Sequence, residues 1–190
     1  ATRAQQLEAL KQKANELRWE QARAGKALND EMLDDPEAWG AMQMLDMENE
    51  GQLIRLPDDR SFLATPNDVK NALNWRPVER ELDASGRELL KDISFDKRWI
   101  DIRTCFDSLF YYLSTIEHYL SSGLLHFDDV GYPLSYFVRE MGRTFWWTTF
   151  RDYIIHYRLG KARKFLQRFE AWRALDRDQY DQKSEEHASP

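Results

Sequence analysis

The chain has 190 residues, of which 42% are hydrophobic and 13% aromatic, and it carries a formal net charge of -6. This length suffices for one domain with its own core, and the apolar content exceeds that of disordered chains. The acidic balance argues against a protein whose whole surface binds nucleic acid, but it is compatible with local basic patches.

Several classes of site are excluded by the residue inventory. The only cysteine, Cys105, lies in an apolar run where a small buried side chain is expected, and a chain without disulfides fits a reducing cytoplasm. No stretch reaches the ~20 apolar residues that cross a bilayer. Clustered Cys and His residues, phosphate-binding glycine loops and hydrolase elbows are absent from the sequence, so we expect neither a metal nor a nucleotide cofactor.

The first 33 residues predict a long amphipathic helix over residues 2–33. They contain no proline, and apolar residues recur at steps of three and four, with Gln21 at one step: Leu7, Leu10, Ala14, Leu17, Ala24 and Leu28. A stripe this narrow packs on a neighbouring helix, on a second copy of the chain or on the core of its own chain. Asp35, Pro36 and Glu37 then predict the start of a second helix that runs through Leu45.

The helical period is lost between residues 48 and 65, which predicts a short β-hairpin near residues 52–63 or an extended loop. Thr65, Pro66 and Asp68 mark the start of a short helix that ends near Trp75. A further amphipathic helix is expected over residues 78–91.

The C-terminal half predicts the core. Apolar residues recur at helical spacing from about residue 95 to 122, and Gly123 is a typical residue for ending that helix. Asp128 is expected to cap a new helical segment that Pro133 interrupts, and further aromatic helices follow. The prediction is therefore a single all-α domain over residues 1–175, a bundle of about six to seven helices, with a disordered acidic tail at 176–190.

One local pattern carries chemistry. Arg151, Asp152 and His156 read R-D-Y-I-I-H within a predicted helix, with Arg151 and His156 about 140° apart around its axis. The pattern resembles the motif of the HEPN superfamily of helical, metal-independent ribonucleases. That resemblance implies that His156 transfers protons and Arg151 stabilises the phosphate, with Asp152 as an orienting residue. In that family the motif is usually assembled across a dimer. The alternative is that His156 packs at the helix surface and the other two are solvated.

The same region is basic. Residues 139–173 hold nine basic and three acidic residues, a local net charge of +6. The candidates for binding phosphates of RNA, or headgroups of an anionic membrane surface, are Arg143, Arg158, Lys161, Lys164 and Arg168. Alternatively, the strip balances the acidic N-terminal third or the acidic tail. The aromatic run at residues 145–150 either stacks on bases or belongs to the core.

Residues from about 105 to 175 resemble an uncharacterised bacterial family of helical domains that usually follow one N-terminal membrane helix. The shared features are the run Ile116 to Tyr119, the turn from Ser122 to Leu125 followed by Asp128, the aromatic helix around Trp146, and a closing helix with Arg158, Phe165, Phe169 and Trp172. The resemblance implies a membrane anchor ahead of Ala1 and a domain at the cytoplasmic face, and it implies no reaction.

These observations favour a non-enzymatic helical interaction domain that self-associates or binds another protein through helix 2–33 and the aromatic C-terminal helices. The alternative is an RNA-cleaving or RNA-binding domain, in a toxin or phage-defence setting, that uses Arg151, Asp152 and His156. A winged-helix DNA reader, with the hairpin at 52–63 as its wing, is less favoured because its recognition helix contains Asp68 and only one basic residue, Lys70.

Overall fold

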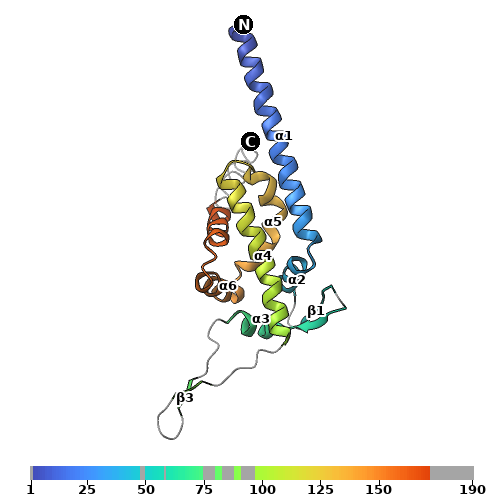
Figure 1. Ribbon diagram of the computed structural model, residues 1–190, viewed down its shortest axis with the longest axis vertical. Helices are drawn as coiled ribbons and strands as arrows, with labels where there is room; N and C mark the ends of the chain where they lie inside the picture. Colours follow the sequence, from blue (N-terminus) through green and yellow to red (C-terminus); the bar gives the residue numbers. More distant parts are fainter. Residues whose placement is uncertain are drawn as a thin grey trace, which may run out of the picture.

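The computed structural model describes residues 2–47, 50–57, 59–74, 80–82, 88–90 and 97–171. Most of these residues are helical, and the strands form two short antiparallel hairpins. Helix α4 (Lys97–Ser121) runs through the middle of the body, and α1 (Arg3–Asp34) lies along the body and extends well beyond it (Figure 1). The predicted all-α class with a short hairpin is confirmed, whereas the tail predicted at 176–190 lies outside the described residues.

Asp35 fixes the joint between the first two helices. Its carboxylate caps α2 (Pro36–Leu45) by accepting the backbone N–H of Ala38 at 2.8 Å. The other carboxylate oxygen accepts hydroxyl hydrogen bonds from Ser108 at 3.1 Å and Tyr112 at 3.4 Å, both on α4. Burial and the neighbouring Asp35 carboxylate raise the pKa of Tyr112 to about 12. The predicted cap is therefore confirmed, and it also ties the joint to the central helix.

The hairpin predicted near residues 52–63 is present. Strand β1 (Gln52–Arg55) pairs with β2 (Ser61–Ala64), and Ile54 lies opposite Phe62 with both side chains buried. Asp59 in the connecting turn has a φ of 57°, a left-handed conformation that Asp tolerates better than most residues.

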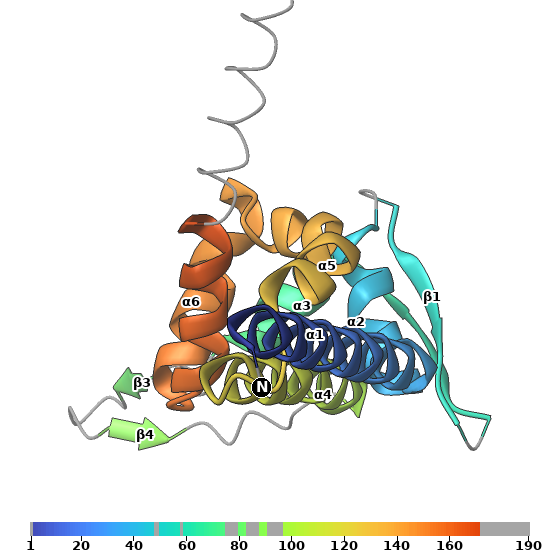
Figure 2. The same cartoon turned by 90° about the horizontal axis from the view of Figure 1, so that it is seen from above.

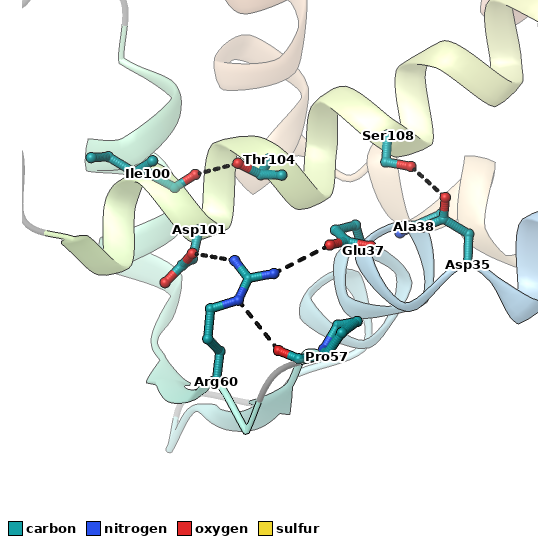
Figure 3. A network of polar contacts seen from close by, with 9 residues as sticks. All are labelled: Asp35, Glu37, Ala38, Pro57, Arg60, Ile100, Asp101, Thr104 and Ser108. Atoms are coloured by element: carbon teal, nitrogen blue, oxygen red, sulfur yellow. Dashed lines mark hydrogen bonds and ion pairs between the residues drawn. The ribbon is translucent and has the colours of Figure 1, made fainter.

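Arg60, at the end of that turn, holds the hairpin against two helices. Its guanidinium donates to Asp101 of α4 at 3.1 Å, to Glu37 of α2 at 3.5 Å and to the carbonyl of Pro57 at 3.3 Å (Figure 3). Asp101 is buried, so this ion pair also satisfies a carboxylate that has little access to water. The network is structural: it fastens the hairpin to the body.

Helix α3 (Pro66–Leu73) begins as predicted, with a capping box between Thr65 and Asp68. It ends at Leu73, two residues earlier than predicted. Arg103 of α4 donates to the carbonyls of Ala72 and, at 3.1 Å, of Asn74. A positively charged group at the C-terminal end of a helix satisfies carbonyls that have no helical partner.

The helix predicted over residues 78–91 is wrong where the structure describes that segment. Arg80–Leu82 (β3) and Glu88–Leu90 (β4) are antiparallel strands, with Glu81 opposite Leu89. Gly86 opposes a helix by about 1 kcal/mol relative to alanine, and a weak propensity of this kind is readily overridden by strand pairing. The spacing of the apolar residues Leu82 and Leu89 is compatible with a helix as well as with two paired strands.

Helix α4 confirms the predicted core helix. Phe106 and Phe110 on one of its faces meet Phe150, with ring centroids 5.2 and 6.2 Å apart, and Tyr153 stacks on Phe110 at 6.0 Å. The four side chains are essentially inaccessible to solvent. Gly123 follows the helix with a φ of 74°, as its predicted role in ending the helix requires.

Helix α5 (Phe127–Met141) corrects two predictions. Its N-cap is His126, whose ring nitrogen accepts the N–H of Asp128 at 3.4 Å, so Asp128 lies in the first turn and is not the cap. Pro133 lies inside the helix and does not interrupt it. A proline removes one N–H, here the one that would reach the carbonyl of Asp129, and the packing of α5 against α1, α2 and α6 keeps the helix continuous.

The second half of α1 packs on α5 at close range. A Cβ added at Gly25 would lie 2.9 Å from the Cβ of Asp129, so a larger residue there would push the helices apart. Arg18 forms a bidentate ion pair with Asp129, with the longer of its two contacts at 2.8 Å. Gln21 donates to the carbonyl of Gly123 at 2.9 Å. These contacts fix the angle at which α1 leaves the body.

The chain closes with α6 (Thr144–His156) and a helical segment at 160–171. The turn between them contains Arg158 with a φ of 55°, and the N–H of Leu159 reaches back to the carbonyl of Ile154 at 2.9 Å. Ala162, Phe165, Leu166 and Phe169 form the buried face of the segment 160–171. Figure 2 shows this segment, in orange-red, returning beside α6.

Cys105 is expected to be unreactive in the folded protein. It is fully buried beside Gly40, and burial, followed by the nearby carboxylates of Glu37 and Asp101, raises the pKa of its thiol to about 12. The thiolate is the reactive form, so a raised pKa leaves the group protonated at neutral pH. We expect no modification by a disulfide reagent at pH 8 without denaturant, and one thiol per chain in 6 M guanidinium as a control; rapid labelling of the folded chain would contradict this.

Candidate functional site

Helix α6 pairs two of the three residues of the R-D-Y-I-I-H pattern, Arg151 and Asp152. The Nε and a terminal nitrogen of Arg151 both donate to Asp152, at 3.1 and 3.0 Å, so this carboxylate pairs with its neighbour in sequence. The His156 ring meets the Tyr157 ring edge-on at 4.8 Å between centroids. Arg151 lines one pocket and Asp152 another, and His156 lines neither. Within one chain, the catalytic assignment of these residues stays a prediction.

The five candidate phosphate-binding residues are divided between two environments. Arg143 pairs with the buried carboxylate of Glu140 at 2.6 Å, and Lys164 and Arg168 pair with Glu117. Arg158 and Lys161 are exposed, in the turn after α6 and in the first turn of the segment 160–171. Three of the five candidates are therefore paired with buried carboxylates of the fold, and two are exposed.

Glu117 explains why basic residues gather on one flank of the segment 160–171. Its side chain is 1% exposed, and its two oxygens accept hydrogen bonds from Arg168, each at 3.0 Å. Ser121 donates to it at 2.8 Å, and the Lys164 ammonium lies 3.3 Å away. Burial alone would raise the pKa of Glu117, but the hydrogen bonds from Arg168, Ser121 and Lys164 outweigh burial and hold that pKa below its usual value.

The opposite flank of the same segment borders a small apolar cleft against α6. Trp147, Arg151, Ile154 and Ile155 line it from α6, at positions that fall on one face of the helix, and Arg163, Leu166 and Gln167 line it from the segment 160–171. The cleft has a volume of about 130 Å³. We call this set of seven residues the α6 cleft.

Two guanidinium groups stand at the α6 cleft. Arg151 is half exposed and shares its charge with Asp152. Arg163 is exposed, and its side chain has no hydrogen-bond or ion-pair partner within the described parts of the chain. Apolar walls beside Arg163, whose charge has no partner among the described residues, and beside the half-exposed Arg151 suit an amphipathic anion.

A second pocket, between α3 and α6, is larger and polar. It has a volume of about 350 Å³ and is lined by Lys70, Asn71, Leu73, Asn74, Thr148, Thr149 and Asp152. Among the residues that the structure describes, no group of three or more His, Cys, Asp and Glu side chains is placed to hold a metal ion. In the same part of the chain, no helix combines the length and apolarity that a bilayer crossing requires.

A third surface is the exposed half of α1. Leu7, Leu10 and Leu17 are 57%, 65% and 53% exposed, although the sequence places them on the apolar stripe. Leu7 precedes Gly25, Leu10 precedes Leu28 and Ala14 precedes Met32 by 18 residues, which is five turns of an α-helix. The exposed stripe is therefore the direct continuation of the face that the body buries at Gly25, Leu28 and Met32.

Comparison of the chain with protein-family models, with curated proteins and with solved structures gives no match. Both family resemblances stay predictions.

Proposed function

We propose that this chain is a helical interaction domain, and that the N-terminal half of α1 binds the same segment of a second copy. The observation that carries the proposal is the exposure of Leu7, Leu10 and Leu17 on a helix that extends beyond the body (Figure 1). Monomeric proteins rarely leave an ordered row of leucines in water, because each leucine gains about 1.5–3 kcal/mol on full burial.

The spacing of the stripe suits an antiparallel pair. In that orientation, Leu7 of one copy meets Leu17 of the other, and Leu10 meets Ala14, so every layer contains at least one leucine. A parallel pair in register would bring the two bodies into the same space, because the body of each copy covers the same face of α1 from Arg18 onward. The antiparallel pair places the bodies at opposite ends and shares a two-fold axis.

Charged residues at the edges of the stripe predict a salt dependence that distinguishes self-association from binding to RNA or to an anionic membrane. Lys11 and Lys13 lie on either side of it, at coiled-coil flanking positions where like charges from two copies approach each other. Salt screens such repulsion between exposed groups. We therefore expect association to strengthen between 50 mM and 500 mM salt, whereas binding to RNA or to an anionic membrane surface would weaken.

Replacing Leu7, Leu10 and Leu17 together with glutamine is expected to abolish self-association. Glutamine keeps helix propensity but removes the apolar surface in both copies, so the dissociation constant should rise at least about 100-fold. Light scattering on a concentration series should show a dimer for the natural chain, with a dissociation constant on the order of 10⁻⁵ M for so small an interface, and a monomer for the variant.

Trp19→Gln is the matched control. Trp19 is 73% exposed on the same helix, but it follows Leu10 by nine residues and so lies on the opposite face, about 180° away. This variant should dimerise like the natural chain. A natural chain that stays monomeric at about 300 µM, far above the expected dissociation constant, would overturn the proposal, as would equal weakening by the Trp19 substitution.

A further inference from the structure

We propose that the α6 cleft is an anchor site for an acidic segment of a partner protein, which inserts one apolar side chain between α6 and the segment 160–171 and presents adjacent carboxylates to Arg151 and Arg163. This site goes beyond the α1 stripe and does not depend on it, since the residues of the two surfaces belong to different helices. The inference follows from the size, the lining and the charge of the cleft.

The size of the cleft selects a single side chain. A cavity of about 130 Å³ is close to the roughly 150 Å³ that accommodates a benzene-sized group, and it is well below the range of about 300–1,000 Å³ typical of pockets for cofactors and metabolites. The side chain of a leucine or a phenylalanine fits this size. A nucleotide or a whole metabolite does not.

The lining of the cleft selects an apolar group. Trp147, Ile154, Ile155 and Leu166 form its walls, and Trp147 and Ile155 are 38% and 50% exposed. Large aromatic and aliphatic side chains around a hole of one side chain's size are typical of the anchor positions in protein interfaces, where Trp and Arg contribute most of the binding free energy.

The charge selects carboxylate neighbours. On the segment 160–171, Lys164 and Arg168 are neutralised by the buried Glu117, whereas Arg163 on the cleft side has no such partner among the described residues. One flank of the segment thus stabilises the fold through Lys164 and Arg168, and the cleft-facing flank carries the cation of Arg163. Guanidinium groups pair with carboxylates in a bidentate fork, which orients a peptide as well as attracting it.

Single-stranded nucleic acid fits the site less well. Binding a phosphate backbone requires a row of cations along a groove, with aromatic faces on which successive bases stack. Here Arg143, Lys164 and Arg168 are paired with buried carboxylates, and the cations that line the cleft are Arg151 and Arg163 alone. The cleft therefore matches one apolar anchor with acidic neighbours better than it matches a polyanion.

The proposal is tested with fluorescein-labelled pentapeptides and fluorescence anisotropy on the full chain. The probe Glu-Glu-Phe-Glu-Glu should bind at least about ten-fold more tightly than Gln-Gln-Phe-Gln-Gln or Glu-Glu-Ala-Glu-Glu, because each loses either the charge or the anchor. Arg163→Gln should weaken the first probe about ten-fold, and Arg163→Lys should restore only part of the binding.

Lys161→Gln is the matched control, since it removes the same charge from an exposed position on the other flank of the segment. Equal losses in the Lys161 and Arg163 variants, or equal binding of the phenylalanine and alanine probes, would show attraction by charge alone and overturn the proposal. Tighter binding of a fluorescein-labelled oligothymidine than of the acidic probe would also overturn it. Repeating the titration with the triple leucine variant separates this site from α1 association, because the monomeric variant should bind the probe normally.

Discussion

Replacing Arg168 with alanine is expected to lower the free energy of unfolding by about 2–3 kcal/mol, and replacing Lys164 as well should raise the loss to about 3–5 kcal/mol. The reason is the buried carboxylate of Glu117, which would keep its charge but lose its partners. The smaller figure for the single change reflects the 40% exposure of Arg168 and the remaining Lys164. Urea unfolding at pH 7 measures both values.

Two controls separate this effect from a general loss of basic residues. Lys161→Ala, one turn from Lys164 on the same segment, should change the stability by less than about 0.5 kcal/mol. Adding Glu117→Gln to the Arg168 variant removes the unpaired charge and should recover part of the loss. If the loss of stability in the double variant equals the sum of the losses in the two single variants, the two residues do not interact as the structure indicates.

The ion pair of Glu117 with Arg168 also makes the stability of the fold depend on pH. The pKa of Glu117 is lower in the folded state than its ordinary value of 4.5. The pair therefore contributes its full stability above that ordinary value and loses it as the pH falls below 4.5 towards the folded-state pKa. The Glu117→Gln variant should show a shallower loss of stability between pH 5 and pH 3 than the natural chain.

Replacing Phe150 with alanine is expected to destabilise the chain by about 3–5 kcal/mol, equivalent to a fall in Tm of about 8–15 °C. Phe150 is fully buried between Phe106 and Phe110, so its removal leaves a cavity in the aromatic core that joins α4 to α6. Calorimetry checks the size. Tyr111→Ala, at a position of α4 that is 66% exposed, is the control and should shift the Tm by less than about 3 °C. A shift of that size for Phe150 would contradict the packing.

The elements that could be predicted are those with local determinants. Asp35 and Pro36 begin α2, Thr65 and Asp68 begin α3, and Gly123 follows α4, because capping and left-handed residues act within one turn of the chain. The long period of apolar residues in α4 also depends only on nearby sequence. Boundaries set in this way were confirmed to within about two residues.

The features that escaped prediction depend on contacts between distant segments. The strands at Arg80–Leu82 and Glu88–Leu90 have a spacing that also suits a helix, and Pro133 stays inside α5 although a proline usually ends one. The pairing of Glu117 with Arg168 joins residues 51 positions apart. In the sequence, Glu117 and Arg168 are each one charged residue within a predicted helix, and no local pattern links the two.

The candidate site, too, could be predicted from the sequence only in part. Arg151 was predicted as a functional residue, and it does line a cleft, but the partners that form the cleft with it are Arg163, Leu166 and Ile155. No spacing rule brings these together, because the turn after α6 decides which flank of the segment 160–171 faces the helix. The stripe of α1 was visible in the sequence, yet only the fold shows which half of it the body covers.

The continuity of α1 gives the proposed pair a fixed span. The helix has 32 residues and no proline inside, and Arg18 and Gln21 brace it against α5 and the preceding turn, so the exposed half projects as a rigid strut. With Leu7 opposite Leu17, the two Gly25 positions are separated by roughly 40 Å along the axis, at 1.5 Å of rise per residue. The length of one helix would then set how far apart two copies hold whatever each of them binds.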